Sequence, residues 1–111
     1  MIHVLRSRAT QQQMEDMLQP LGTYVKLAVD PRHGILAGGG VLHADCEAAL
    51  LEEGSHQQDV WGADWNPSAQ QVTFESLINI RPRQNNPSLE ILNPAIRERV
   101  AEIVLRLLGG V

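Results

Sequence analysis

The segment that begins at residue 43 carries three residues that could bind a metal ion. His43, Asp45 and Glu47 form the pattern His-x-Asp-x-Glu, and imidazole and carboxylate groups are common ligands of divalent cations. The surrounding residues favour a helix, on which His43 and Glu47 share a side while Asp45 points elsewhere. A metal site would therefore need a distant third ligand such as Asp59, and it would support a divalent-metal-dependent hydrolase or nuclease-like enzyme.

A structural role accounts for the same residues, and we favour it. An acidic residue near the helix start, here Asp45 or Glu47, interacts favourably with the positive end of the helix dipole. His43 would then lie near the N-cap. Cys46 falls on the apolar stripe of the expected helix, so we expect a buried thiol rather than a nucleophile.

Three consecutive glycines, Gly38 to Gly40, precede this helix and raise the question of a phosphate-binding loop. No lysine follows them as a Walker loop requires, and the dinucleotide-binding glycine pattern fails at His43. Carboxylates in the first helical turn would also repel a phosphate placed there. We therefore expect a tight turn or a close backbone approach at the glycines.

Polar and aromatic residues gather in the second half of the chain, where they could bind an anion or a partner. Both tryptophans fall on one face of an expected strand. Guanidinium, amide and hydroxyl groups follow them, and together these groups suit a carboxylate or a phosphate. The expected binding residues are Trp61, Trp65, Asn79, Arg81, Arg83, Asn86 and Ser88.

Structural alternatives stay open for this second set. The tryptophans could cover the core or a subunit contact, and the arginines could hold a long loop against the many acidic residues in the middle of the chain. If Arg81 binds a ligand, Arg81→Ala should weaken binding and leave the melting temperature nearly unchanged. A large loss of stability would instead identify a structural ion pair.

The hydrophobic pattern predicts the elements that must position these residues. Alternating residues predict strands near 2–6, 24–30, 35–37, 59–65 and 71–80, and helical spacing predicts helices near 10–22, 44–53 and 94–108. The order β-α-β-β-α-β-β-α predicts an α+β fold, with a single layer of mainly antiparallel or mixed sheet, about five strands, packed with three helices. Residues 1–111 are expected to form one α+β domain.

Particular residues support the ends and faces of these elements. Thr10 and Gln13 match a capping box, and Asn93 and Pro94 suit the N-cap and first position of the last helix. In the expected strand 71–80, alternation predicts one half-buried face. That face comprises Val72, Phe74, Ser76, Ile78 and Ile80.

Composition limits the classes of function. The chain has 111 residues, of which 43% are hydrophobic and 20% charged, as in ordinary globular domains. A single cysteine, no secretory leader pattern and no run of about 18 apolar residues favour a cytoplasmic protein with no membrane association. The net charge of −4 argues against nucleic acid as a partner.

Three stretches carry a resemblance to a known family. They are GGGVLHADCEAALLEEGSHQQDVWG, SLINIRPRQNNPS and NPAIRERV. Through these stretches the chain resembles a family of small uncharacterised bacterial proteins, a domain of unknown function that occurs in cyanobacteria among others. The resemblance covers nearly the whole chain, from Ile2 to Leu108. The resemblance implies a bacterial, cytoplasmic setting and brings no activity, cofactor or catalytic residue with it.

Taken together, these patterns favour a small non-catalytic accessory module over an enzyme. We expect it to form a homodimer and to bind a protein partner or an anionic small molecule through the second set of residues. No cofactor is predicted. A divalent metal enters only with the alternative enzyme, which would hold it with His43, Glu47 and Asp59.

Overall fold

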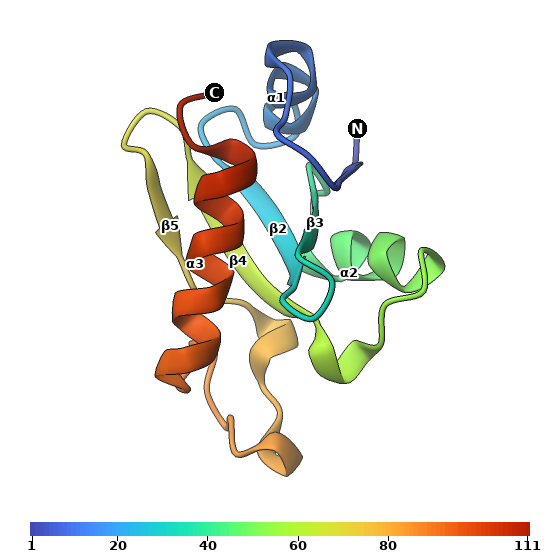
Figure 1. Ribbon diagram of the computed structural model, residues 1–111, viewed down its shortest axis with the longest axis vertical. Coiled ribbons are helices and arrows are strands. Elements are labelled where there is room, and N and C mark those ends of the chain that lie inside the picture. The colour runs from blue at the N-terminus through green and yellow to red at the C-terminus, as the bar shows by residue number, and fades with distance from the viewer.

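Five strands form one antiparallel sheet with three helices around it in the computed structural model, which describes all 111 residues (Figure 1). The strands are β1 (His3–Leu5), β2 (Val25–Asp30), β3 (Ile35–Gly38), β4 (Trp61–Asn66) and β5 (Gln71–Thr73). The helices are α1 (Gln11–Leu18), α2 (His43–Glu52) and α3 (Pro94–Leu108). The predicted α+β class and element order are confirmed, and the open choice between an antiparallel and a mixed sheet is resolved as antiparallel.

The sheet has the strand order β1-β3-β2-β4-β5, with β2 at its centre. Strands β2 and β3 form the hairpin expected from the sequence, and Gly34 in its turn has a φ of +69°, a conformation that glycine adopts without strain. On the other side, β2 pairs with β4 so that Lys26 lies opposite Asp64 and Ala28 opposite Gly62. This register decides which side chains of the two strands share a face.

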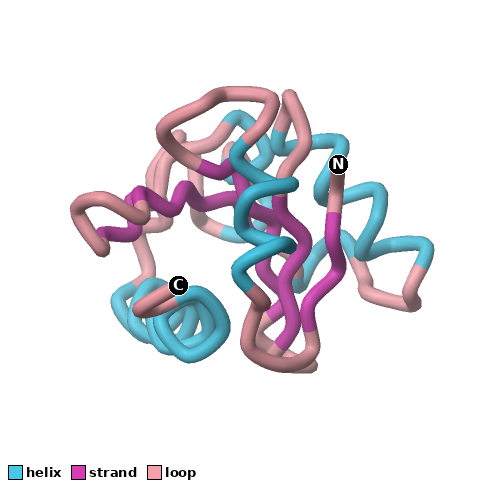
Figure 2. Tube along the Cα trace, turned by 90° about the horizontal axis from the view of Figure 1, so that it is seen from above, coloured by secondary structure: helices cyan, strands magenta, loops and turns pink.

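Helices cover both faces of the sheet (Figure 2). One face packs against α1 and α3, in a core of 17 buried residues that includes Met14, Leu27, Trp65 and Ile103. The opposite face packs against α2, in a smaller cluster of six buried residues that includes Ala28, Cys46, Leu50 and Val60. None of the three helices has the length and the apolar character that crossing a bilayer requires.

The predicted N-terminal ends of the helices are confirmed, whereas the first helix, expected near 10–22, already ends at Leu18. Thr10 and Gln13 form the capping box of α1, each accepting a hydrogen bond from the other's backbone N–H. Asn93 caps α3 by accepting from two backbone N–H groups, and Pro94 is the first helical residue. At α2, Asp45 accepts from the backbone N–H of Leu42, so Asp45 stabilises the helix start as expected.

The close backbone approach expected at the glycines is confirmed. A Cβ added to Gly38 would lie 2.8 Å from the Leu27 side chain, and one added to Gly39 would collide with the carbonyl oxygen of Met1. Gly39 also has a φ of +102°. Only glycine fits this crossing from β3 to α2 without displacing its neighbours.

The expected strand 71–80 is wrong beyond Thr73. The chain leaves the sheet after β5 and forms a short 3-10 turn at Leu77–Asn79. Ser76 caps this turn by accepting from the N–H of Ile78, because serine and asparagine side chains compete with the strand for backbone groups. The shared face of Val72, Phe74, Ser76, Ile78 and Ile80 therefore does not form, and Leu77 is 77% exposed.

Candidate functional site

The two tryptophans lie in the core rather than on an open surface. Trp61 and Trp65 share a face of β4 with Ala63, as the alternation predicted, and all three belong to the core beneath α3. Trp65 is completely enclosed, while one side of the Trp61 ring meets the guanidinium of Arg81. Of the two, Trp61 alone contacts the remaining candidate residues.

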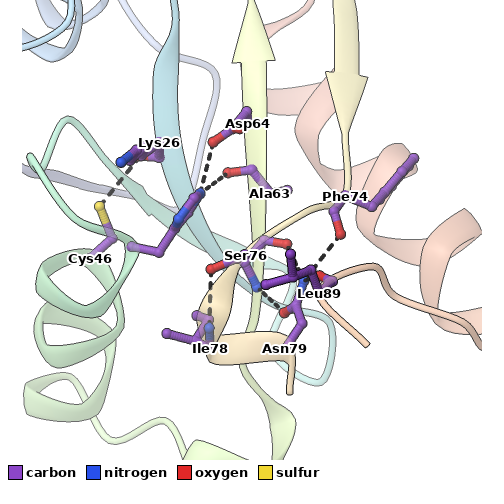
Figure 3. Close-up of polar contacts among 11 residues, drawn as sticks. Lys26, Cys46, Ala63, Asp64, Phe74, Ser76, Ile78, Asn79 and Leu89 are labelled. Carbon is purple, nitrogen blue, oxygen red and sulfur yellow. Dashed lines mark hydrogen bonds and ion pairs between the residues drawn. The ribbon is translucent and has the colours of Figure 1, made fainter. Parts of the chain in front are cut away.

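Asn79 holds the 3-10 turn against the sheet. Its side-chain oxygen accepts from the N–H of Gly62 at 2.8 Å. Its NH2 group donates to the carbonyls of Gly62, Phe74 and Leu89 at 3.0–3.1 Å. Figure 3 shows these contacts converging on the fully buried amide. Every hydrogen-bonding position of Asn79 is therefore used inside the protein.

Asn86 does the same for the next loop. Its amide donates to the carbonyls of Asn79, Ser88 and Glu90 and accepts from the N–H of Leu92. The Ser88 hydroxyl accepts from the backbone N–H of Glu90. These side chains replace missing strand pairing with side-chain hydrogen bonds, and they leave little capacity for a ligand.

The same loop positions Arg81. A backbone bridge pairs Arg81 with Asn86, each donating its N–H to the other's carbonyl. Between them, Pro82 begins a short 3-10 turn and Asn85 takes a left-handed conformation with a φ of +60°, which asparagine tolerates better than most residues. The bridge directs the Arg81 side chain towards α2 and β4.

The guanidinium of Arg81 is buried between helix and sheet. Nη2 lies 3.4 Å from Oε2 of Glu47 on α2, and both side chains are 11% exposed. Nε donates to the Ile78 carbonyl at 2.9 Å, and the group lies 4.8 Å from the centre of the Trp61 ring. Burial lowers the pKa of this guanidinium, and the Glu47 carboxylate opposes that shift.

One nitrogen of Arg81 stands apart from these contacts. Nη1 is enclosed by the protein and has no hydrogen-bond partner. A buried donor without an acceptor costs free energy, and most such groups in proteins are paired. Arg81 is thus held firmly by three contacts, and its fourth polar group is a buried donor that stays unpaired.

A cavity of about 540 Å³ opens beside Arg81. Its polar wall consists of Glu47, Gln57, Gln58, Arg81, Arg83 and Gln84. Arg83 is exposed and forms no ion pair, and the Gln84 amide donates to the Gln58 carbonyl. Two guanidinium groups and three amides therefore face one carboxylate, which is already paired with Arg81. We refer to this space as the arginine cavity.

The structure does not bring the expected metal ligands together. His43 lies 2.7 Å from Asp64, Glu47 pairs with Arg81, and Asp59 lies 3.8 Å from Arg32. No group of three or more histidine, cysteine or acidic side chains has the geometry to hold a metal ion. His43 and Glu47 instead have their own partners on different elements, and the buried Oδ2 of Asp59 makes no hydrogen bond.

A family model matches this chain over residues 3–107, and its description is a protein of unknown function, DUF5674. The chain belongs to the DUF5674 family. The predicted membership of an uncharacterised family is thereby confirmed, and bacterial origin stays a prediction. Comparisons with curated proteins and with solved structures gave no match.

Two further polar sites of the DUF5674 domain are structural. Cys46 is buried, its thiol meets the Lys26 carbonyl, and burial raises its pKa. Asp30 is fully buried at the β2–β3 turn, where it accepts from Ser55 at 2.6 Å and pairs with His33 at 2.7 Å. Burial alone raises the pKa of Asp30, but these hydrogen bonds outweigh it and lower the pKa.

Sequence reasoning missed the glutamines of the arginine cavity and the partner of His43 in this DUF5674 domain. Gln57, Gln58 and Gln84 have no motif, and they meet only through the fold. Asp64 alternates with the buried Ala63 and Trp65 on β4, so the sequence indicates which face it occupies. The pairing of Asp64 with His43 depends on where α2 lies, which the sequence does not indicate.

Proposed function

We propose that this domain binds a small anion in the arginine cavity and acts as a non-catalytic accessory module. The ligand would carry a carboxylate or a phosphate group. The observation that carries the proposal is the exposed guanidinium of Arg83, which has no ion pair and lies on the wall of a cavity that it shares with Arg81. A ligand oxygen would supply the acceptor that the protein itself does not.

The charge distribution supports an anion despite the overall charge of −4. Glu47 is neutralised by Arg81, so Arg83 adds an uncompensated positive charge at the rim. A guanidinium offers two parallel N–H groups to a carboxylate or phosphate, and this geometry favours such groups over chloride. The local field of the cavity, rather than the net charge, would select the ligand.

The arrangement of Arg81 also supports binding without catalysis. The cation is fixed by Glu47, Ile78 and Trp61, which gives a rigid anchor of the kind that ligand sites require. The alternative hydrolase has less support, because His43 is paired with Asp64 and Glu47 with Arg81, and Asp59 lies apart from both, with Arg32 at 3.8 Å. The proposed module would therefore recognise its ligand and leave it unchanged.

Calorimetric titration with citrate and with inorganic phosphate, at constant ionic strength, tests the proposal. We expect at least one of the two anions to bind, and Arg83→Gln to weaken that binding by about tenfold, the loss of one charge-assisted interaction. Arg99→Gln is the matched control, because Arg99 is an exposed arginine on α3 that pairs only with Glu102.

Two outcomes would overturn the proposal. Neither anion binding to the wild-type protein would remove the anion site. Equal weakening by Arg83→Gln and Arg99→Gln would show attraction to general positive charge rather than to the arginine cavity.

The expected homodimer stays a prediction. Leu77, Ile80 and Leu89 are exposed apolar side chains on the segment between β5 and α3, and exposed apolar clusters are typical of protein contacts. Sedimentation of the purified protein would measure its oligomeric state directly.

A further inference from the structure

His43 does not line the arginine cavity, and its hydrogen bonds define which ring nitrogen carries the proton. Its Nε2 lies 2.7 Å from Oδ1 of Asp64 and 3.2 Å from the carbonyl oxygen of Ala63 (Figure 3). A carbonyl oxygen only accepts hydrogen bonds, so we assign the proton to Nε2. The other ring nitrogen, Nδ1, then presents a lone pair.

Nδ1 of His43 is open to a ligand. It makes no hydrogen bond within the protein, and it is not among the enclosed polar atoms that lack a partner. The ring lines a second cavity, of about 320 Å³, distinct from the arginine cavity. The sequence placed His43 near a helix start, and the sheet register supplies the carboxylate that orients it.

This second cavity, which we call the histidine cavity, has one free charge of each sign on its wall. Lys26 lies on the α2 face of β2, opposite Asp64 in the register, and Glu75 follows β5. Neither lies within 4.0 Å of an oppositely charged group. An ammonium, a carboxylate and an imidazole acceptor are thus available around one space.

The rest of the wall is apolar. Leu42, Leu77 and Leu89 line it, and all three are largely exposed. Exposed leucines around a concave surface lose unfavourable contact with water when a ligand covers them. A volume of about 320 Å³ lies at the small end of the range of about 300–1,000 Å³ for ligand sites, which suits a small metabolite.

We propose that the histidine cavity binds a small zwitterion with an apolar side chain, of the class of apolar α-amino acids. The carboxylate of the ligand pairs with Lys26, and its ammonium group donates to Glu75 and to Nδ1 of His43. The aliphatic group covers the leucines. This ligand matches each free polar group of the wall with its complement and leaves none unpaired.

Titration with L-leucine, followed by amide NMR shifts, tests the assignment with three matched analogues. 4-Methylpentanoate lacks the ammonium group, isopentylamine lacks the carboxylate, and glycine lacks the side chain. We expect L-leucine to shift residues of the histidine cavity and each analogue to bind about tenfold more weakly, since each removes one charge-assisted or apolar contact.

Variants locate the site and give the deciding outcomes. Lys26→Gln and Glu75→Gln should each weaken L-leucine binding about tenfold, and Glu98→Gln, on α3 and away from the cavity, should leave it unchanged. No shift with L-leucine, or equal binding of 4-methylpentanoate, would overturn the proposal. So would a long-range 1H–15N spectrum that places the His43 proton on Nδ1. Binding of citrate at the arginine cavity is independent of all three results.

Discussion

Two sets of polar side chains on the segment from Ser76 to Leu92 use their hydrogen-bonding groups differently. Asn79 and Asn86 direct all of theirs to backbone groups of their own chain. Arg81 keeps an enclosed nitrogen without a partner, and Arg83 keeps its whole guanidinium free. In the sequence, the asparagines and the arginines are equally good candidates for binding. In the fold they differ, because only the arginines keep hydrogen-bond donors without a partner.

Side chains with internal partners and side chains without them should contribute differently to stability and to binding. A side chain whose partners are all internal stabilises the loop, and its removal leaves buried backbone groups unpaired. An exposed side chain beside a cavity with no internal partner, such as Arg83, contributes little to the loop and can contribute to a ligand. Arg81, which is paired with Glu47, contributes to stability as well. Substitutions of the asparagines should therefore change stability, and substitution of Arg83 should change binding alone.

Asn79→Ala should have the largest effect on stability. It removes the hydrogen bonds of the buried amide and leaves the N–H and the carbonyl of Gly62 without their Asn79 partner. The carbonyls of Phe74 and Leu89 lose the amide but keep the backbone N–H groups of Ile91 and Ser76. We expect the free energy of unfolding to fall by about 4 kcal/mol. Urea unfolding measures it, and Asn79→Asp, of equal size, should be at least as damaging because its carboxylate would face three carbonyl oxygens. A loss below about 1 kcal/mol would contradict the scaffold role.

Arg81→Ala should lower the free energy of unfolding by about 3 kcal/mol, because it leaves Glu47 buried without its counter-charge. This is the result expected from the sequence for a structural ion pair, and the contact between Arg81 and Glu47 favours that alternative over an unchanged melting temperature. The double variant Arg81→Met with Glu47→Leu should recover most of the loss, since an apolar pair removes the unpaired charge. Failure to recover would assign the loss to the contact with Trp61 instead.

Ser88→Ala should cost about 1 kcal/mol, because its hydroxyl makes one hydrogen bond to the exposed N–H of Glu90. Water can replace this bond in the variant. Thermal unfolding measures the change, and a loss as large as that of Asn79→Ala would place Ser88 within the rigid scaffold.

Arg83→Gln should change the free energy of unfolding by less than about 0.5 kcal/mol, as expected for an exposed side chain without an ion pair. It is the variant in which stability and binding separate most clearly. A marked loss of stability would show that Arg83 supports the loop as the asparagines do, and the division of the segment would then be wrong.

The elements of this fold follow from local patterns. Helix caps such as Thr10 and Asn93, the turn at Gly34 and the crowded glycines at 38–40 act on their immediate neighbours, so the sequence predicts them well. The strand expected at 71–80 failed because Asn79 bonds to β4 and to a later loop. Such contacts join distant parts of the chain, and the alternation of apolar and polar residues within 71–80 does not predict them.

The candidate sites show the same limit. Arg81 and Arg83 could be proposed from their chemistry and spacing. Glu47 was expected at the helix start or as a metal ligand, and its pairing with Arg81 was not predicted. The pair of His43 with Asp64 depends on the packing of α2 against β4. Which polar groups remain free is a property of the packed structure, and it is this property that points to binding.

NMR of the arginine side chains during a citrate titration tests the central claim most directly. The Nε–Hε resonances of Arg81 and Arg83 should shift with a common saturation curve, while that of Arg99 stays in place. Unchanged Arg81 and Arg83 resonances, or equal shifts at Arg99, would contradict an anion site in the arginine cavity.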